Sequence, residues 1–426
     1  MKILTGEQYE IELNKSDTTI GSHEDLDRTV LKIIEQVRER GDEALIEYTA
    51  QFDKVELDNL LVSQEEFIEA RALVSDEFIV AIKKAHENIS AFHEEQTEKS
   101  WFTTKASGIF LGQKITPLAR VGIYVPGGKA TYPSTVLMNA IPAKIAGVKN
   151  IAITTPAGQD GKINPHVLVA AAEVGIETIY KVGGAQAVAA LAYGTETVQK
   201  VAKIVGPGNA YVARAKKWVF GDVAIDMIAG PSEICVVADE TAVPRYVAAD
   251  LLSQAEHDEQ ATAVCITTSQ SFAEELSEEV KKQTALSERK SIIEKSIEDN
   301  GRIVRVDSLN EAFELVNILA PEHLQLMVEN PMEQMQFIDN AGAIFLGNHS
   351  PEALGDYIAG PNHTLPTSGT STFSSPLGVY DFIKRSSIIH YSEEALRDVS
   401  DDIITLANAE GLSAHANSIA IRKADK

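Results

Sequence analysis

One repeated pattern constrains the fold of this chain most: a short apolar run, a glycine-containing turn and then a segment with helical spacing. Units of strand, helix and strand form right-handed crossovers, and such units build a largely parallel sheet. The pattern therefore predicts an α/β domain between residues 115 and 239. The apolar runs there are Val121–Val125, Asn150–Thr154, Ile179–Val182 and Lys203–Val205.

The same alternation returns between Pro244 and Gly347, which predicts a second sheet. Residues 26–96 repeat apolar side chains at helical spacing and predict a helical N-terminal region. The charged segment Phe272–Ile297 is most simply one long, solvated connecting helix. The expected fold class is α/β, with two parallel-sheet domains and an extended C-terminal tail. The candidate strands of the second sheet are Ala261–Thr267, Arg302–Val306, Leu324–Val328 and Ala343–Leu346.

The chain is expected to divide into four parts. Residues 1–25 form an N-terminal arm, and residues 26–120 with 239–380 form a first α/β domain. Residues 121–238 form a second α/β domain, and residues 381–426 form the tail. The tail is polar, acidic and too small for a core of its own. We expect it to dock on a partner, because exchange of such an arm between identical chains is a low-cost route to a dimer.

Composition excludes several kinds of partner. The chain has 38 basic and 62 acidic residues, a net charge of −24, which argues against nucleic acid or an anionic membrane. The chain has no run of 18 apolar residues, so no transmembrane helix is expected. Its first residues lack the apolar core of a signal peptide. We expect a cytoplasmic protein.

The two cysteines, Cys235 and Cys265, lie within apolar runs that are typical of buried strands. Neither belongs to a CxxC motif, so a cysteine zinc site is not expected. A catalytic thiolate needs an exposed, electropositive setting, which buried strands do not offer. Any metal would have to be held by histidine, carboxylate or amide groups.

A candidate site lies at the end of a helix predicted to begin near Pro244. Gln254 and His257 are three residues apart, so on a helix they project from one face. Together they can hold a metal ion or a polar substrate. The alternative is that His257 ends a surface helix, where a cation suits the helix dipole.

Glu322 and His323 are a candidate acid–base pair. An imidazole can take the proton of an alcohol while hydride leaves the carbon, and a carboxylate can deprotonate a water. Oxidation of an alcohol to an acid passes through an aldehyde, which must gain an oxygen before a second hydride leaves. Since the chain has no suitable cysteine, a hydrated aldehyde is the consistent route. The alternative is a turn with incidental polar residues.

Glycine turns follow several predicted strands, including Pro126–Gly128, Gly183–Gln186 and Gly206–Asn209. Such turns aim backbone N–H groups and helix N-termini at anionic ligands, which fits a dinucleotide. However, no GxGxxG motif follows a strand, and no acidic residue stands where a ribose would need one. By motif alone, tight turns explain these glycines equally well.

Several longer motifs have the order and spacing of those in the histidinol dehydrogenase family, which the chain resembles from about Val121 to His415. The resemblance implies a zinc- and NAD-dependent enzyme that oxidises L-histidinol to L-histidine through L-histidinal, with two NAD used in turn. This reaction is the last step of histidine synthesis. The motifs are Gly206–Ala210, Ala229–Glu233, Leu251–His257, Ala320–His323 and Leu354–Asp356, with Glu410 and His415 in the tail.

The resemblance also implies roles for single residues and an incomplete, Rossmann-like arrangement with an atypical cofactor site. It implies an intertwined homodimer in which the tail histidine completes the neighbour's zinc site. His363 lies in a family-like segment and could line the site, but it receives no role.

The resemblance also implies the residues that bind each ligand. One zinc per chain would be held by Gln254, His257, Asp356 and His415. NAD would contact Tyr124, Gln186 and Asn209. The substrate would contact Ser232 and Glu410, the four zinc ligands, and the catalytic residues Glu322 and His323.

Three alternatives remain at this stage. A related dehydrogenase could oxidise another amino alcohol or a sulfonate-bearing diol. A zinc hydrolase could use Glu322 to activate a metal-bound water without binding NAD. A non-catalytic binding protein is a distant third, because it would not need an acid–base pair beside a metal site.

Overall fold

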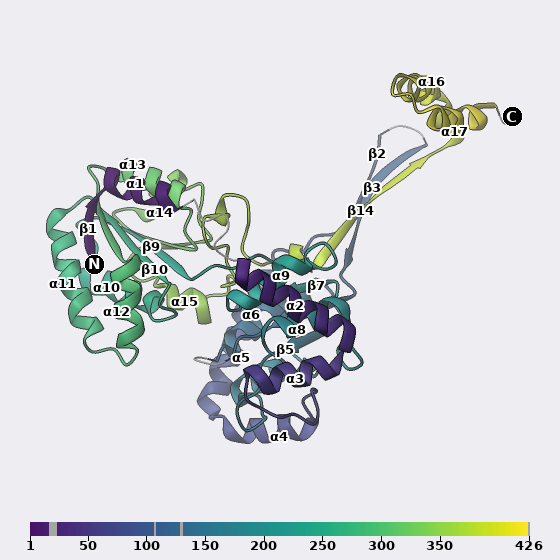
Figure 1. Ribbon diagram of the computed structural model, residues 1–426. Coiled ribbons are helices and arrows are strands. Elements are labelled where there is room, and N and C mark those ends of the chain that lie inside the picture. Colours follow the sequence, from purple (N-terminus) through teal and green to yellow (C-terminus); the bar gives the residue numbers. More distant parts are fainter. Residues whose placement is uncertain (17–23, 106–107, 128–130, 425–426) are drawn as a thin grey trace. The chain divides into compact units, whose positions relative to one another are not determined.

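The computed structural model describes residues 1–16, 24–105, 108–127 and 131–424. Two compact units are formed: Met1–Gln96 with Ala119–Phe382, and Thr97–Leu118 with Ile383–Lys426. Figure 1 labels their elements. Residues 17–23 of the expected arm and Gly128 of the expected glycine turn lie outside the described residues.

The first unit contains a six-stranded parallel sheet whose strand order is β1-β11-β10-β9-β12-β13. Side chains alternate between its faces, so Ile234 and Val236 join one apolar cluster while Cys235 and Val237 join another. Figure 1 shows helices on both faces, with α10–α12 on one side and α1 and α13 on the other. The strands are β1 (Lys2–Thr5), β9 (Glu233–Ala238), β10 (Thr262–Thr267), β11 (Arg302–Arg305), β12 (His323–Met327) and β13 (Ala343–Leu346). The helices are α1 (Gly6–Ser16), α10 (Pro244–Ala255), α11 (Gln270–Thr284), α12 (Lys290–Asn300), α13 (Leu309–Leu319), α14 (Pro331–Gln334) and α15 (Glu352–Tyr357).

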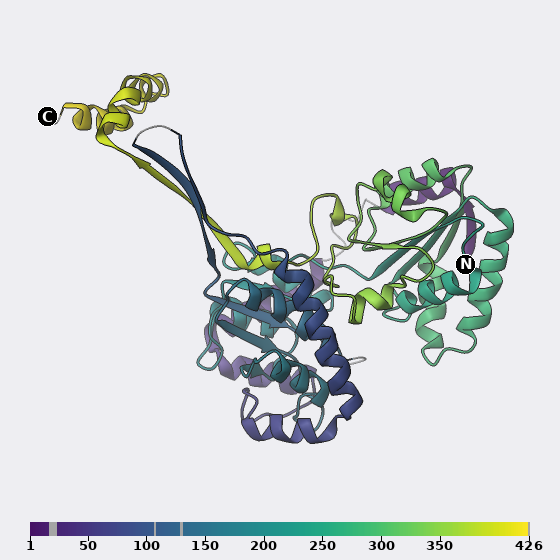
Figure 2. The ribbon, with the colours of Figure 1, turned by 180° about the vertical axis from the view of Figure 1, so that it is seen from behind.

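The first unit also contains a five-stranded parallel sheet of order β6-β5-β4-β7-β8. Helices α6–α9 flank it, and the N-terminal helices α2–α5 pack on these as an outer layer; Figure 2 shows the layers from behind. The strands are β4 (Arg120–Tyr124), β5 (Asn150–Thr154), β6 (Ile179–Tyr180), β7 (Lys203–Val205) and β8 (Ala224–Ile225). The helices are α2 (Glu24–Arg40), α3 (Asp42–Phe52), α4 (Gln64–Leu73), α5 (Asp76–Glu94), α6 (Pro133–Ile145), α7 (Pro165–Glu173), α8 (Gly184–Tyr193) and α9 (Ala210–Val219).

The α/β class with two parallel sheets is confirmed, but sheet membership differs from the expected division in three places. Strand β9, assigned to the domain of residues 121–238, pairs with β10 and β12 in the six-stranded sheet. Strand β1 of the expected arm is the edge strand of that sheet. Helices α2–α5 pack beside the five-stranded sheet instead of the six-stranded one; the buried apolar face of α2, which includes Val30 and Ile33, lies against α8 and α9.

The prediction of one long connecting helix over Phe272–Ile297 is wrong. The segment forms two helices, α11 and α12, which are separated between Thr284 and Lys290. Apolar residues on both helices, such as Leu276 and Ile293, are buried against the six-stranded sheet. The periodic apolar residues therefore determine that these helices pack on the sheet, and the many charged residues of the segment lie on the exposed faces.

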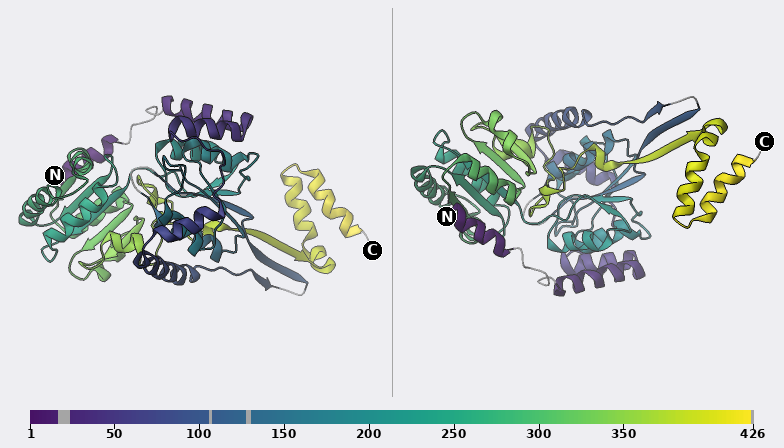
Figure 3. Two further views of the ribbon diagram at one scale, coloured as in Figure 1. Left: turned by 90° about the horizontal axis from the view of Figure 1, so that it is seen from below. Right: turned by 90° about the horizontal axis from the view of Figure 1, so that it is seen from above.

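The second unit is an antiparallel three-stranded sheet, order β14-β3-β2, with two C-terminal helices. The predicted strand after Tyr380 is present as β14, and α16 and α17 pack against each other, as Figure 3 shows. Large apolar side chains of this unit stay open to solvent: Ile389 is 74% exposed and Leu406 66%. Its elements are β2 (Trp101–Thr104), β3 (Ile109–Pro117), β14 (Ile383–Tyr391), α16 (Glu393–Ala409) and α17 (Ser413–Ala424). Across the described residues, no helix has the length and apolar character that crossing a membrane requires.

Candidate active site

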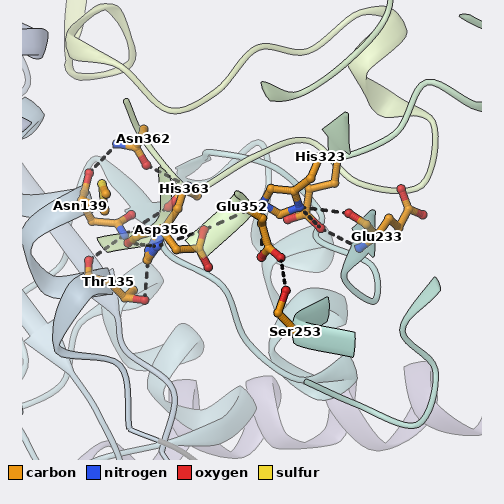
Figure 4. Close-up of polar contacts among 12 residues, drawn as sticks. Thr135, Asn139, Glu233, Ser253, His323, Glu352, Asp356, Asn362 and His363 are labelled. Atoms are coloured by element: carbon orange, nitrogen blue, oxygen red, sulfur yellow. Dashed lines mark hydrogen bonds and ion pairs between the residues drawn. The ribbon is translucent and has the colours of Figure 1, made fainter. Parts of the chain in front are cut away.

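The candidate acid–base residues lie at the start of β12, at the amino-terminal edge of the six-stranded sheet. Both are buried, with His323 as the first residue of the strand. Helix α10 runs back along the sheet, so its last turn brings Gln254 to the same edge. Figure 4 shows His323 beside residues of α15 and the start of β9.

Glu233, at the start of β9, holds both residues of the pair through its backbone. Its N–H donates to Glu322 Oε2 at 2.9 Å, and its carbonyl lies 2.9 Å from Nδ1 of His323. Because a carbonyl can only accept, Nδ1 of the imidazole carries the hydrogen. The other ring nitrogen, Nε2, is therefore a free base in the neutral ring.

Nε2 of His323 is buried and has no hydrogen-bond partner among the described residues. It faces two carboxylates: Oδ1 of Asp356 at 3.9 Å and Oε1 of Glu352 at 4.0 Å. Burial lowers the pKa of His323, and the charge of Asp356 opposes that shift. The neutral, proton-accepting form is thus favoured at neutral pH.

Glu352 and Asp356, four residues apart on α15, lie with His257 in one group. Their ligand atoms all lie within 4.8 Å of one another. His257 follows the end of α10, and its N–H donates to the carbonyl of Gln254 at 3.2 Å. An imidazole and two carboxylates are suitable ligands for a divalent cation such as Zn²⁺.

Gln254 has its amide set by Glu352. A carboxylate can only accept, so Nε2 of the amide faces it and donates to its two oxygens at 2.6 and 3.0 Å. In this orientation Oε1 of Gln254 is 3.3 Å from the Ser232 hydroxyl. Ser253 also donates to Glu352, at 2.9 Å. The amide oxygen of Gln254 accepts from Ser232 and keeps a second lone pair for a ligand.

The carboxylates of this site lack a cationic partner. No lysine or arginine of the described chain forms an ion pair with Glu322, Glu352 or Asp356; their only ion-pair partners are histidines. Burial, reinforced by Asp356, raises the pKa of Glu352 to about 8. Burial also raises the pKa of Glu322 well above its usual value, with added repulsion from Glu233, Glu352 and Asp356. A bound divalent cation would relieve this repulsion, so the residues fit a metal.

His363 lies beside the same cluster. Its Nδ1 is 3.1 Å from the backbone carbonyl of Asp356, and its Nε2 is 3.4 Å from Oγ1 of Thr135. The neighbouring Asn362 fixes the loop, because its amide donates to the carbonyl of Met138 at 2.6 Å. His363 therefore lines the site, although the sequence alone assigned it no role.

The residues expected to contact NAD gather at the carboxyl-terminal edge of the five-stranded sheet. Tyr124 ends β4, and its hydroxyl accepts from the N–H of Gly184 at 3.0 Å. Gln186 is buried on α8, and its Oε1 has no partner among the described residues. Asn209 follows β7 and caps α9 by accepting from the N–H of Val212 at 3.1 Å. The unpartnered buried oxygen of Gln186 can accept a hydrogen bond from a hydroxyl or amide group of a dinucleotide.

Comparison with known proteins identifies the family. The family model of histidinol dehydrogenase matches residues 17–423. The histidinol dehydrogenase of Oceanobacillus iheyensis is 57% identical over 423 residues, 99% of each chain, and that of Bacillus subtilis is 55% identical over 93% of each.

The chain belongs to the histidinol dehydrogenase family. A crystal structure of the histidinol dehydrogenase from Elizabethkingia anophelis matches the fold with a TM-score of 0.93 at 40% identity, covering 99% of this chain and 97% of that one. The resemblance predicted from the motifs is thus confirmed over almost the whole chain.

Two residues that the family resemblance ties to the site belong to the second unit. Glu410 follows α16, and His415 lies in the first turn of α17. Both are exposed within that unit. Ser232, Gln254, His257, Glu322, His323 and Asp356 all belong to the first unit.

Sequence reasoning missed Glu352, Ser253 and Glu233. A signal for Glu352 was present, because it stands four residues before Asp356 and shares its helix face. Ser253 is adjacent to Gln254 but gives no sign that its hydroxyl reaches α15. Glu233 acts mainly through its backbone N–H and carbonyl, and because nearly every residue has these groups, the sequence does not reveal this role.

Proposed function

We propose that the chain oxidises L-histidinol to L-histidine through L-histidinal, with two NAD reduced per substrate. Its family makes it an oxidoreductase that acts on a CH–OH group with NAD. The observation that carries the proposal is the free Nε2 of His323, a buried base that faces Asp356 and Glu352. We also propose that the enzyme acts in the cytoplasm, where free histidinol and NAD would be available.

In the first oxidation, Nε2 of His323 accepts the proton of the substrate hydroxyl while hydride leaves the carbon, and the product is the aldehyde. NAD, when bound, accepts the hydride. The Nδ1–H bond to the carbonyl of Glu233 holds the ring in the required tautomer and stabilises it once protonated.

In the second oxidation, Glu322 takes a proton from a water whose oxygen bonds to the aldehyde carbon, giving a gem-diol. The raised pKa of Glu322 makes its carboxylate a stronger base. Loss of a second hydride and of a hydroxyl proton then yields the carboxylic acid. In sum, one alcohol, one water and two NAD give one carboxylate, two NADH and three protons.

Zinc is proposed as the resident metal, one ion per chain. Gln254, His257 and Asp356 would hold it, with His415 as the fourth ligand by family resemblance. When bound, zinc would orient the substrate and polarise its alcohol oxygen. Glu352, whose oxygens already accept from the Gln254 amide and the Ser253 hydroxyl, would orient the Gln254 oxygen toward the ion instead of binding the ion itself. Ser232 and Glu410 are the further substrate contacts that the resemblance implies.

A homodimer with shared active sites is part of the proposal. The second unit buries few large apolar side chains and leaves Ile389, Leu406 and Ile421 exposed. Such a surface favours docking on another chain. In the exchange, His415 and Glu410 of one chain would complete the neighbour's site.

The test is to add NAD and L-histidinol to the purified protein and follow NADH absorbance. Two NADH per histidinol, with little turnover of other amino alcohols or sulfonate diols, is the expected result. Turnover of another alcohol at a higher kcat/KM would favour a related dehydrogenase. No NADH from any alcohol, together with zinc-dependent hydrolysis, would favour the hydrolase alternative.

A further inference from the structure

We infer that the buried ion pair between Lys216 and Asp226 positions the backbone turn at Gly206 for NAD binding. The inference rests on the proposed function, since it concerns the same cofactor. Lys216 is 1% exposed and is among the largest fully buried side chains of the described residues. Removing two charges from water is costly, and a well-packed apolar pair would often be as stable. A positioning task explains such a buried pair better than stability does.

The pair binds both polar groups of one residue. Oδ2 of Asp226 accepts the N–H of Gly206 at 2.7 Å, and Nζ of Lys216 donates to the carbonyl of Gly206 at 2.9 Å. Lys216 and Asp226 are joined by a salt bridge, and Oδ1 of Asp226 also accepts from the N–H of Met227 at 2.6 Å. The orientation of the backbone at Gly206 is thus fixed from two sides.

Gly206 needs this support because its backbone is unusual and crowded. Its φ is +108°, and a Cβ on it would lie 2.2 Å from the carbonyl oxygen of Tyr124. Only glycine fits there without strain. The turn lies directly against Tyr124 and leads into Asn209, the N-cap of α9. Rotation of either peptide flanking Gly206 would therefore displace two of the three proposed NAD contacts.

The pair also ties three elements together. Lys216 lies on α9, Asp226 directly follows β8, and Gly206 directly follows β7. No other lysine of α9 does this, since the next residue, Lys217, is exposed. Lys216 and Asp226 are accordingly positioning residues, which act on NAD through the turn instead of touching it.

The experiment compares Lys216→Met and Asp226→Asn with the control Lys217→Met, which removes the same charge from the same helix. NADH affinity is measured by fluorescence titration of the zinc-loaded protein, beside zinc content and the KM for histidinol. We expect Lys216→Met and Asp226→Asn to weaken NADH binding by about tenfold or more, equivalent to about 1.4 kcal/mol. Zinc content and the KM for histidinol should change little, and Lys217→Met should match the wild type.

The outcomes separate this inference from the proposed function. A lower melting temperature with unchanged NADH affinity would mean that the pair is only structural, and the inference would be wrong. If Lys216→Met does not fold, Asp226→Asn, which is nearly equal in size to the native residue, decides by the same criterion. A wild-type protein that binds no NADH would contradict the proposed function itself. If the wild type and both variants bind NADH equally well, only the inference is contradicted.

Discussion

The hydroxyl of Ser253 donates to Oε2 of Glu352 at 2.9 Å, although 99 residues separate the two in sequence. Glu352 in turn holds the amide of Gln254, the neighbour of Ser253 on α10. The last turn of α10 and the helix α15 are therefore locked together at the proposed metal site. Groups of this kind orient metal ligands without binding the ion themselves.

Glu352→Gln is expected to weaken zinc binding. The amide of the introduced glutamine can donate as well as accept, so it no longer requires Gln254 to turn its N–H₂ group toward position 352. The oxygen of Gln254 is then no longer held toward the ion. The expected loss in zinc affinity is about 10–100-fold, measured by competition with a chromophoric chelator. Ser253→Ala, which removes one hydrogen bond to Glu352, should show a smaller loss. Equal zinc affinity in Glu352→Gln and the wild type would contradict the orienting role.

His257→Asn should lose most of its zinc. The purified wild type is expected to hold about one zinc per chain, from a set of four ligands. Chelation should abolish activity, and added Zn²⁺ should restore it. Metal analysis of His257→Asn is compared with His349→Asn, in which the replaced histidine is exposed. Full zinc content and normal activity in His257→Asn would remove that residue from the site.

Glu322→Gln and His323→Ala should affect different steps. Glu322→Gln should still oxidise the alcohol but slow oxidation of the aldehyde much more, because it cannot deprotonate the water. His323→Ala should impair alcohol oxidation as well, by about 10²–10⁴-fold, the usual contribution of a general base. Supplying histidinol or histidinal separately resolves the two steps. Equal losses in both steps for Glu322→Gln would exclude its role in hydration.

Co-refolding of two inactive variants should recover activity if the site is shared. In a mixed dimer of His257→Asn and His415→Asn chains, one site combines both substituted positions and the other combines both native histidines. One intact site out of two is therefore expected, with activity above either parent. The control is each variant refolded alone. If mixed dimers form and stay inactive, each chain supplies its own His415 and the shared site is wrong.

His93 should make the protein less stable in mild acid. It is fully buried, with Nδ1 2.9 Å from the carbonyl of Ile89 and Nε2 3.3 Å from the amide nitrogen of Asn362. Burial lowers its pKa below 6.5. The unfolded chain therefore binds a proton at a higher pH than the folded chain does. Its stabilising contribution is complete above the unfolded pKa and is lost as pH falls through the folded pKa.

His93→Gln should remove this part of the acid sensitivity. One proton contributes a slope of at most about 1.4 kcal/mol per pH unit. The free energy of unfolding is measured in urea at several pH values below neutrality and at one protein concentration, since association adds to stability. His349→Gln, at an exposed position, is the control. A variant as sensitive to acid as the wild type would show that His93 does not titrate on unfolding.

Local pattern determined most of the architecture. The predicted apolar runs became the strands β4–β7 and β10–β13, because a strand buried on both faces needs a continuous apolar run whichever strands it pairs with. The motifs around Gln254, Glu322 and Asp356 could likewise be found from sequence, since each is a short stretch with its own chemistry.

Only the tertiary structure decided how those stretches meet. The pairing of β9 with β10 and β12, the reach of Ser253 to Glu352 and the hold of Glu233 on His323 all join residues far apart in sequence. No local spacing encodes such contacts, because they depend on which strand ends and helix ends the sheet brings to one edge. The same holds for Lys216 and Asp226. In sequence they are an ordinary lysine and aspartate, and burial around Gly206 makes them a pair.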